Sequence, residues 1–126
     1  LQATRDEYSF RPDMYKYMIE FADRKTQKDI IKKYLAMMQQ KQDQADERSN
    51  GKVNLFTENA YDILAIGYYR LGNKKKSEEC AKKFDERYKL RLVDMKKMFK
   101  DEKAQVQIDD EYHQRINDLR AKIGMK

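Results

Sequence analysis

His113 is the only histidine of the chain, and most catalytic or metal-binding chemistry would have to be built around it. Asp109 stands four residues before it and Asp110 three residues before it, so a carboxylate and an imidazole would share one face of a helix. A dimetal site between helices needs two such half-sites and further carboxylates, and the sequence has no second histidine. We therefore expect no metal site, and we expect His113 to be exposed and paired with Asp109.

Nucleophilic catalysis would have to combine His113 with Cys80 or with a serine. Neither Cys80 nor Ser9, Ser49 or Ser77 stands in a strained or glycine-rich turn of the kind that presents a nucleophile. The four glycines are isolated, so no phosphate-binding loop is present. Cys80 falls within an amphipathic segment and is expected to pack as a small apolar residue. We expect no enzymatic activity and no cofactor, although a parent protein with an enzymatic part elsewhere is compatible with this expectation.

A run of three lysines begins one of the expected helices, where positive charge opposes the helix dipole at a cost of a few tenths of a kcal/mol per residue. Local stability does not favour them there. They belong to a candidate basic surface made of Lys74, Lys75, Lys76, Lys82, Lys83 and Lys89. Such a surface suits an acidic peptide, a carboxyl terminus, an anionic lipid or a nucleic acid. The alternative is a solvated face whose charge is balanced by Glu78 and Glu79.

The composition favours an all-α fold. Of 126 residues, 40% are charged, one is Pro, four are Gly and none is Trp, while good helix formers are abundant. The 28 Lys and Arg exceed the 22 Asp and Glu by six, but both signs are mixed along most of the chain. No apolar run approaches the roughly 18 residues that span a bilayer. Because Leu1 is not an initiator Met, we expect a processed product or a piece of a larger protein.

Residues 57–88 form the clearest unit, which we expect to be two antiparallel helices. Thr57 is a candidate cap for the first helix, Gly72 suits the left-handed conformation that ends it, and Asn73 suits the cap of the second. Large and small residues alternate at positions where the two helices must approach. These packing positions are Tyr61, Leu64, Ala65, Tyr68, Ser77, Ala81 and Phe84.

Together with the junction from Tyr68 to Asn73, this pattern resembles a tetratricopeptide repeat unit. The resemblance covers roughly a quarter of the chain. It implies antiparallel helical hairpins stacked as a repeat array or a small bundle of about five helices. It also implies a non-catalytic module that holds an extended peptide or a neighbouring domain in a groove. Tyr69 and Arg70 are then candidate partner-binding residues beside Lys74, Lys75, Lys76, Lys82 and Lys83.

The single helical domain 1–126 divides into segments around this unit: an arm at 1–11, a first hairpin at 12–47, a linker at 48–56, the hairpin at 57–88 and a C-terminal helical extension at 89–126. The first hairpin should contain a helix from Pro12 to Arg24, with the apolar stripe Met14, Met18, Phe21 and Ala22 broadened by Tyr15 and Ile19. A second helix should begin near Gln27 behind a capping box at Thr26. Residues 39–48 offer one Ala and nothing else to bury, so that helix should continue into solvent or fray. The Ser49-Asn50-Gly51 cluster should end it. Phe56 should staple the third helix, which follows Thr57.

The second helix of the 57–88 hairpin, the fourth helix of the chain, should continue into the C-terminal extension and bury Leu92, Met95 and Phe99 there. The apolar spacing loses phase at residues 100–105, which predicts a bend or a short loop. A last helix from about Gln107 to Ile123 should close the open end of the stack. Its apolar stripe is Ile108, Tyr112, Ile116, Leu119 and Ile123.

Three functions remain open from the sequence. The first is a helical scaffold that binds a protein or peptide, or a neighbouring domain of the parent chain. The second is a basic helical bundle that binds nucleic acid or an anionic surface. The third is a self-association domain that uses the apolar stripe of the last helix as its seam.

Overall fold

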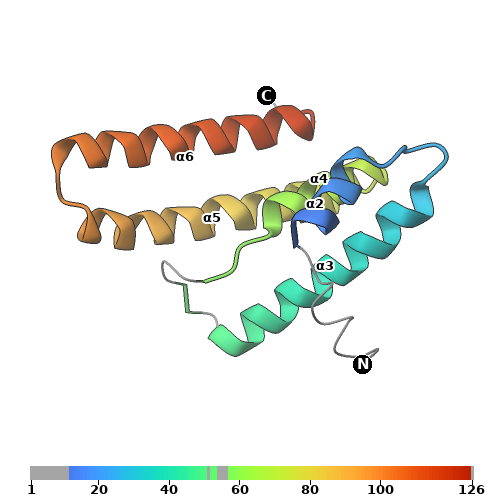
Figure 1. Ribbon diagram of the computed structural model, residues 1–126, viewed down its shortest axis with the longest axis horizontal. Coiled ribbons are helices and arrows are strands. Elements are labelled where there is room, and N and C mark those ends of the chain that lie inside the picture. The colour runs from blue at the N-terminus through green and yellow to red at the C-terminus, as the bar shows by residue number, and fades with distance from the viewer. Residues whose placement is uncertain (1–11, 51, 54–56, 126) are drawn as a thin grey trace.

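The computed structural model describes residues 12–50, 52–53 and 57–125, and this part of the chain contains helices and no strand (Figure 1). The all-α fold class is therefore confirmed. Among the described helices, none has the length and apolar character that crossing a membrane requires. The helices are α2 (Pro12–Phe21), α3 (Lys28–Ser49), α4 (Tyr61–Arg70), α5 (Lys74–Met98) and α6 (Glu102–Lys122).

Helix α4 lies at the centre of the fold. It packs most extensively on α5 and also contacts α2, α3 and α6. The turn between α4 and α5 matches the expectation for residues 57–88, because Gly72 has φ of +84° and the side chain of Asn73 accepts a hydrogen bond from the backbone N–H of Lys76. A left-handed residue at this position ends the first helix, and the side-chain cap begins the second.

Small residues allow α4 to approach its neighbours closely. The Ser77 hydroxyl donates to the Ala65 carbonyl across 2.6 Å, which joins α5 directly to the backbone of α4. On the other side of α4, a Cβ atom at Gly67 would lie 2.6 Å from Leu35 Cδ1 and 2.9 Å from Ile19 Cγ2. Gly67 is therefore the point where α2 and α3 press against α4.

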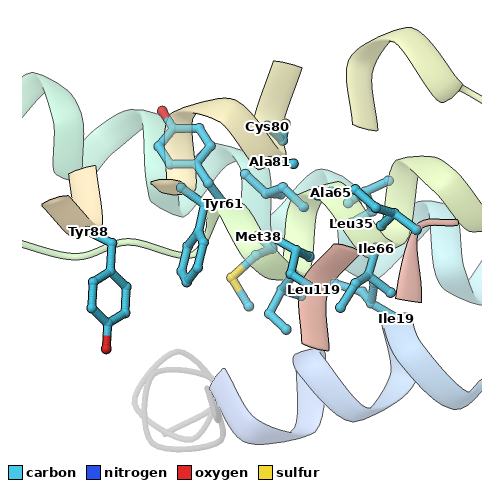
Figure 2. Packing of buried hydrophobic residues seen from close by; sticks show 14 of the residues in the cluster. Ile19, Leu35, Met38, Tyr61, Ala65, Ile66, Cys80, Ala81, Tyr88 and Leu119 are labelled. Atoms are coloured by element: carbon cyan, nitrogen blue, oxygen red, sulfur yellow. The ribbon is translucent and has the colours of Figure 1, made fainter. Parts of the chain in front are cut away.

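One hydrophobic core joins all five helices. Figure 2 shows Ile19 of α2, Met38 of α3, Ile66 of α4 and Leu119 of α6 gathered in one cluster, with Ala81 of α5 nearby. Ile19 is fully buried, and the other four side chains are at most 9% exposed. The four isoleucine, methionine and leucine side chains each contribute roughly 1.5–3 kcal/mol on full burial. The sequence predicted stacked hairpins closed by a last helix, and the core cluster accordingly includes residues of α6 as well as of the two hairpins.

Helix α2 is shorter than predicted. It ends at Phe21 and not at Arg24, because the Asp23 carboxylate accepts hydrogen bonds from the backbone N–H groups of Lys25 and Thr26 and forms a turn. The capping box at Thr26 is also wrong. Gln27 precedes α3 without a side-chain cap on that helix, and its side chain instead accepts a hydrogen bond from the backbone N–H of Asp23.

The polar half of α3 was predicted wrongly. It neither frays nor projects into solvent: the helix continues to Ser49, and Gln42 and Ala45 are buried. Asn50 then ends α3 with φ of +55°, inside the Ser-Asn-Gly cluster where the end was expected. Helix α4 in turn begins at Tyr61, three residues later than a Thr57 cap implies, and the Thr57 hydroxyl donates to the Lys52 carbonyl instead.

The last two helices form a long antiparallel pair. The break lies at residues 99–101, so α6 starts at Glu102, five residues before the predicted Gln107. Leu92 and Met95 are only partly buried, and Phe99, which was expected in the core, is 51% exposed. In the stripe of α6, Tyr112 is partly buried, and the remaining members are buried, namely Ile108, Ile116, Leu119 and Ile123.

The stripe of α6 is also the predicted self-association seam. Its apolar residues pack on the chain's own core and are not presented at the surface of α6. Their side chains close the helical stack, as the sequence predicted for a terminal helix. The predicted arm at residues 1–11 and Phe56, the expected staple of the third helix, lie outside the described residues.

Candidate partner-binding site on helix α2

Helix α2 exposes a face made of large apolar side chains. Met14 is 42% exposed, and Tyr17 and Phe21 are each 62% exposed. Their spacings of three and four residues place them on one side of the helix, which we call the α2 apolar face. Tyr15 and Ile19 lie on the opposite side in the core. The predicted stripe therefore has the wrong register, because two of its four members point to solvent.

The charged residues in the middle of α2 face other helices. The Glu20 carboxylate is 14% exposed and forms an ion pair with Lys122 of α6, with 2.6 Å between Oε1 and Nζ. Lys16 lines a cleft of about 180 Å³ together with Asp62 of α4 and Arg115 of α6. Helix α2 is thus apolar on two sides: Tyr15 and Ile19 are buried in the core, while Tyr17 and Phe21 are exposed. A surface helix ordinarily has one apolar stripe, which faces the core.

The cleft beside α2 holds a carboxylate in a shielded position. Burial raises the pKa of Asp62, and the Ile63 N–H, Lys16 and Arg115 oppose this rise. The nearest Arg115 nitrogen stands 3.8 Å from the Asp62 carboxylate. The ion pair between Arg115 and Asp62 links α6 to α4 beside α2.

The two exposed aromatic rings contact each other. The ring centroids of Tyr17 and Phe21 are 5.1 Å apart, and the ring planes are inclined at 45°. Rings in such tilted contact restrict each other's rotation, so less side-chain entropy is lost when a partner covers them. The α2 apolar face is therefore a preorganised surface.

Tyr69 and Arg70, predicted to bind a partner, make contacts within the chain. Arg70 Nη1 donates to the Ile19 carbonyl across 2.9 Å, which ties the end of α4 to α2. Tyr69 is partly buried beside Gly124, where a Cβ atom would approach its hydroxyl oxygen to 3.0 Å. These contacts give both residues a role in the fold, and their role in binding stays a prediction.

The predicted lysines are exposed along α5, each with different neighbours. Lys76 Nζ lies 4.8 Å from the centre of the Tyr68 ring, and Lys83 Nζ lies 5.4 Å from that of Tyr61. Lys82 lines a pocket of about 290 Å³ between α5 and α6. Lys74 and Lys75 occupy the first turn of α5. The structure therefore confirms that these cations are accessible without gathering them around one ligand-sized cavity.

Ser9, one of the residues considered for catalysis, lies outside the described residues. His113 is exposed, and its ring lies 5.2 Å from that of Tyr112. Asp109 does not form the expected pair with His113 but binds Lys96 of α5, with 2.7 Å between the charged atoms. Cys80 is buried as predicted, and burial raises the pKa of its thiol. No cluster of potential metal ligands occurs within the described ranges.

A polar network that the sequence did not reveal lies beneath α3. The Asp46 carboxylate accepts hydrogen bonds from the Tyr61 hydroxyl, from Arg87 and from Gln42. Burial alone would raise the pKa of Asp46, but these hydrogen bonds together hold the pKa below its ordinary value. Burial and the hydrogen bond to Asp46 raise the pKa of Tyr61, which therefore stays protonated. The network joins α3, α4 and α5.

Above this network, a groove of about 430 Å³ runs between α3 and residues 58–60. Its described lining includes the apolar residues Met38 and Ala60 and the basic side chains of Lys41 and Arg48. Arg48 forms an ion pair with Glu58, which also lines the groove, with 3.7 Å between the charged atoms. Both side chains are more than 60% exposed, and ion pairs this exposed contribute little to stability.

Comparison with protein families, with curated proteins and with solved structures found no match for this chain.

Proposed function

We propose that this protein is a non-catalytic helical scaffold that binds a helix of another protein, or of a neighbouring domain, through the α2 apolar face. The observation that carries this proposal is a second apolar side of α2, which is exposed although Tyr15 and Ile19 bury the other side in the core. Met14, Tyr17 and Phe21 are exposed, whereas Glu20 is paired inside the molecule. Large aromatic residues exposed together on one face are typical of protein-binding surfaces.

The chemistry of the face defines the partner. A partner helix with an apolar stripe would cover Tyr17 and Phe21 and would gain roughly 1–2 kcal/mol from each half-exposed ring. Two aromatic anchors at one helical spacing suit the packing of one helix on another. The resemblance of residues 57–88 to a tetratricopeptide repeat supports the same reading, because repeats of that family are stabilised by stacking against adjacent helical hairpins.

A selection from a displayed library of helical peptides tests the proposal. We expect the chain to enrich peptides with an apolar stripe and to bind them with little dependence on salt. Tyr17→Asp with Phe21→Asp should abolish this binding. The matched control is Leu90→Asp with Val93→Asp, which places the same charges on exposed apolar positions of α5. Equal binding by both double variants and the unmodified chain would contradict the proposal.

The salt dependence of binding addresses the nucleic-acid alternative. The lysines Lys74, Lys75, Lys76, Lys82 and Lys83 are exposed, and an electrostatic site of this kind binds DNA or RNA with affinity that falls steeply as ionic strength rises. A salt-tolerant peptide complex supports the scaffold. A steeply salt-dependent nucleic-acid complex, reversed by Lys74→Glu with Lys75→Glu and Lys76→Glu, supports the basic bundle instead.

A further inference from the structure

Helix α5 carries most of the positive charge excess of the chain. It contains ten Lys and Arg against five Asp and Glu, a difference of +5, whereas the whole chain has +6. The charges that looked mixed along the sequence are therefore strongly biased in one helix. At 1.5 Å per residue, this helix is about 37 Å long, so the excess is spread along a linear surface.

Basic and apolar side chains share the outer side of α5. Positions separated by seven or by three to four residues fall on one side of a helix. The exposed basic and apolar side chains on this side are Lys75, Lys82, Lys89, Leu90, Val93 and Lys97, and Lys100 is exposed two residues beyond the helix end. We call this set the α5 basic face. Glu79 and Glu86 also lie on this side, and Lys89 pairs with Asp85 of its own helix at 3.2 Å, so positive charge predominates without being exclusive.

Apolar residues continue the α5 basic face onto the turn into α6. Leu90 and Val93 are 54% and 51% exposed, and Met98, Phe99 and Val106 around the turn are between 51% and 59% exposed. Figure 1 shows this turn at one end of the molecule, apart from α2, α3 and α4. The exposed apolar side chains around the turn therefore lie at one end of the molecule.

The turn is closed by its own hydrogen bonds. The Gln105 side-chain amide donates to the carbonyl of Phe99 and, across 3.0 Å, to that of Lys96. The Phe99 N–H donates to the Met95 carbonyl. Carbonyls at the end of a helix are costly to remove from water when they lack partners. Here two of them are already bound, so the turn can enter an apolar environment at reduced cost.

We propose that the α5 basic face docks on an anionic lipid bilayer, with α5 lying along the headgroups and Met98 and Phe99 entering the interface. Lysines beside an apolar strip are the pattern of helices that lie in a membrane surface. Nucleic acid accounts for the lysines but not for Leu90 and Val93, because its phosphate backbone gains nothing from aliphatic contacts.

Sedimentation with lipid vesicles tests this proposal. The chain is mixed with vesicles of pure phosphatidylcholine and with vesicles that contain about 30% phosphatidylserine. We expect binding to the anionic vesicles alone, and binding that weakens as salt rises. Val93→Ser with Phe99→Ser should lower partitioning roughly tenfold, because two apolar anchors are lost. Tyr17→Ser with Phe21→Ser removes two equally exposed side chains from α2 and should leave partitioning unchanged.

A charge comparison completes the test. Lys97→Glu with Lys100→Glu should lower partitioning more than tenfold, since each lysine near an anionic leaflet contributes about fivefold. Lys32→Glu with Lys33→Glu on α3 changes the net charge equally and should lower it by about twofold or less. Equal losses of partitioning in both double variants would show that only the net charge of the chain matters, and would overturn the proposal. Binding to a DNA or RNA probe without binding to anionic vesicles would also overturn it.

Discussion

At the scale of single residues, Gln42 shows why a polar segment stays on the core. Its side chain is 2% exposed, donates to Asp46 and to the Glu58 carbonyl, and accepts from the Ala60 N–H across 2.6 Å. Buried polar groups are ordinarily hydrogen-bonded, and this buried amide bonds two backbone groups directly before the start of α4. Gln42 therefore joins the end of α3 to the start of α4, which has no side-chain cap of its own.

Gln42→Leu should lower the free energy of unfolding by about 2–4 kcal/mol. The substitution keeps a similar volume but leaves the Glu58 carbonyl and the Ala60 N–H without this partner, at about 1–3 kcal/mol for each buried group. Urea denaturation followed by circular dichroism measures the change. Gln40→Leu, on an exposed side of the same helix, should change stability by less than about 0.5 kcal/mol. Similar effects of both substitutions would contradict the bridging role.

Asp46 should make stability depend on pH in the acid range. Because the pKa of the folded carboxyl lies below the ordinary value of about 3.9, the stabilising ionised form is fully present above that value. The contribution is lost as pH falls through the folded pKa. Asp46→Asn should therefore cost about 2 kcal/mol near pH 7, and the difference from the unmodified chain should shrink below about pH 4. Urea denaturation at pH 7, 4 and 2.5 measures it.

The control for this pH dependence is Asp43→Asn, which removes an exposed carboxylate from the same helix and leaves the bonds to Arg87 and Tyr61 intact. A difference between Asp46→Asn and the unmodified chain that stays constant down to pH 2.5 would show that charge on Asp46 contributes nothing to the fold.

At the scale of the helices, α4 is placed by close approach and not by charge. Gly67 lies where three helices meet, and its missing side chain leaves room for Leu35 and Ile19. Glycine lowers helix propensity by about 1 kcal/mol relative to Ala, so local preference alone would not select it there. Its position is explained by the packing of α2 and α3 on α4.

Gly67→Val should destabilise the protein by about 1–3 kcal/mol despite the better helix propensity of Val. The added atoms would overlap Leu35 Cδ1 and Ile19 Cγ2, and both of these side chains are buried. Thermal and urea denaturation measure the loss. Ala121→Val, at an exposed position of α6, should cost only about 0.5 kcal/mol through its lower propensity. A stabilised Gly67→Val variant would show that the contact relaxes without cost.

At the scale of the whole molecule, α6 completes the fold. Its stripe is buried against the core, and Lys122 and Arg115 tie it to α2 and α4. The exposed large apolar residues lie on α2, on the second half of α5 and around the turn into α6. The two proposals together assign one exposed face to a partner helix and another to an anionic lipid surface.

Leu119→Ala distinguishes a closing helix from a self-association seam. Leu119 is 5% exposed within the chain, so its truncation should lower the free energy of unfolding by about 2–4 kcal/mol at any protein concentration. Asn117→Ala, exposed on the same helix, should have little effect. Denaturation combined with light scattering reads both quantities. A Leu119→Ala variant that keeps its stability and only dissociates an oligomer would restore the seam.

The sequence determined those features that depend on neighbours in the chain. Few helix breakers gave an all-α fold, and Gly72 and Asn73 marked the central turn because their backbone and capping preferences act within four residues. The prediction of a buried stripe on the last helix was also correct, because an apolar face with 3.6-residue periodicity ordinarily packs against the core. Cys80 lies in an amphipathic segment and is buried for the same reason.

Only the tertiary structure decided which apolar residues are covered and which polar residues are buried. Tyr17 and Phe21 match the helical period as well as Tyr15 and Ile19 do, and the positions of α3, α4 and α6 choose between the two faces. Gln42 is buried because hydrogen-bonding groups far along the chain meet it. Burial depends on surfaces that fit in space, and periodicity along one helix does not contain that information.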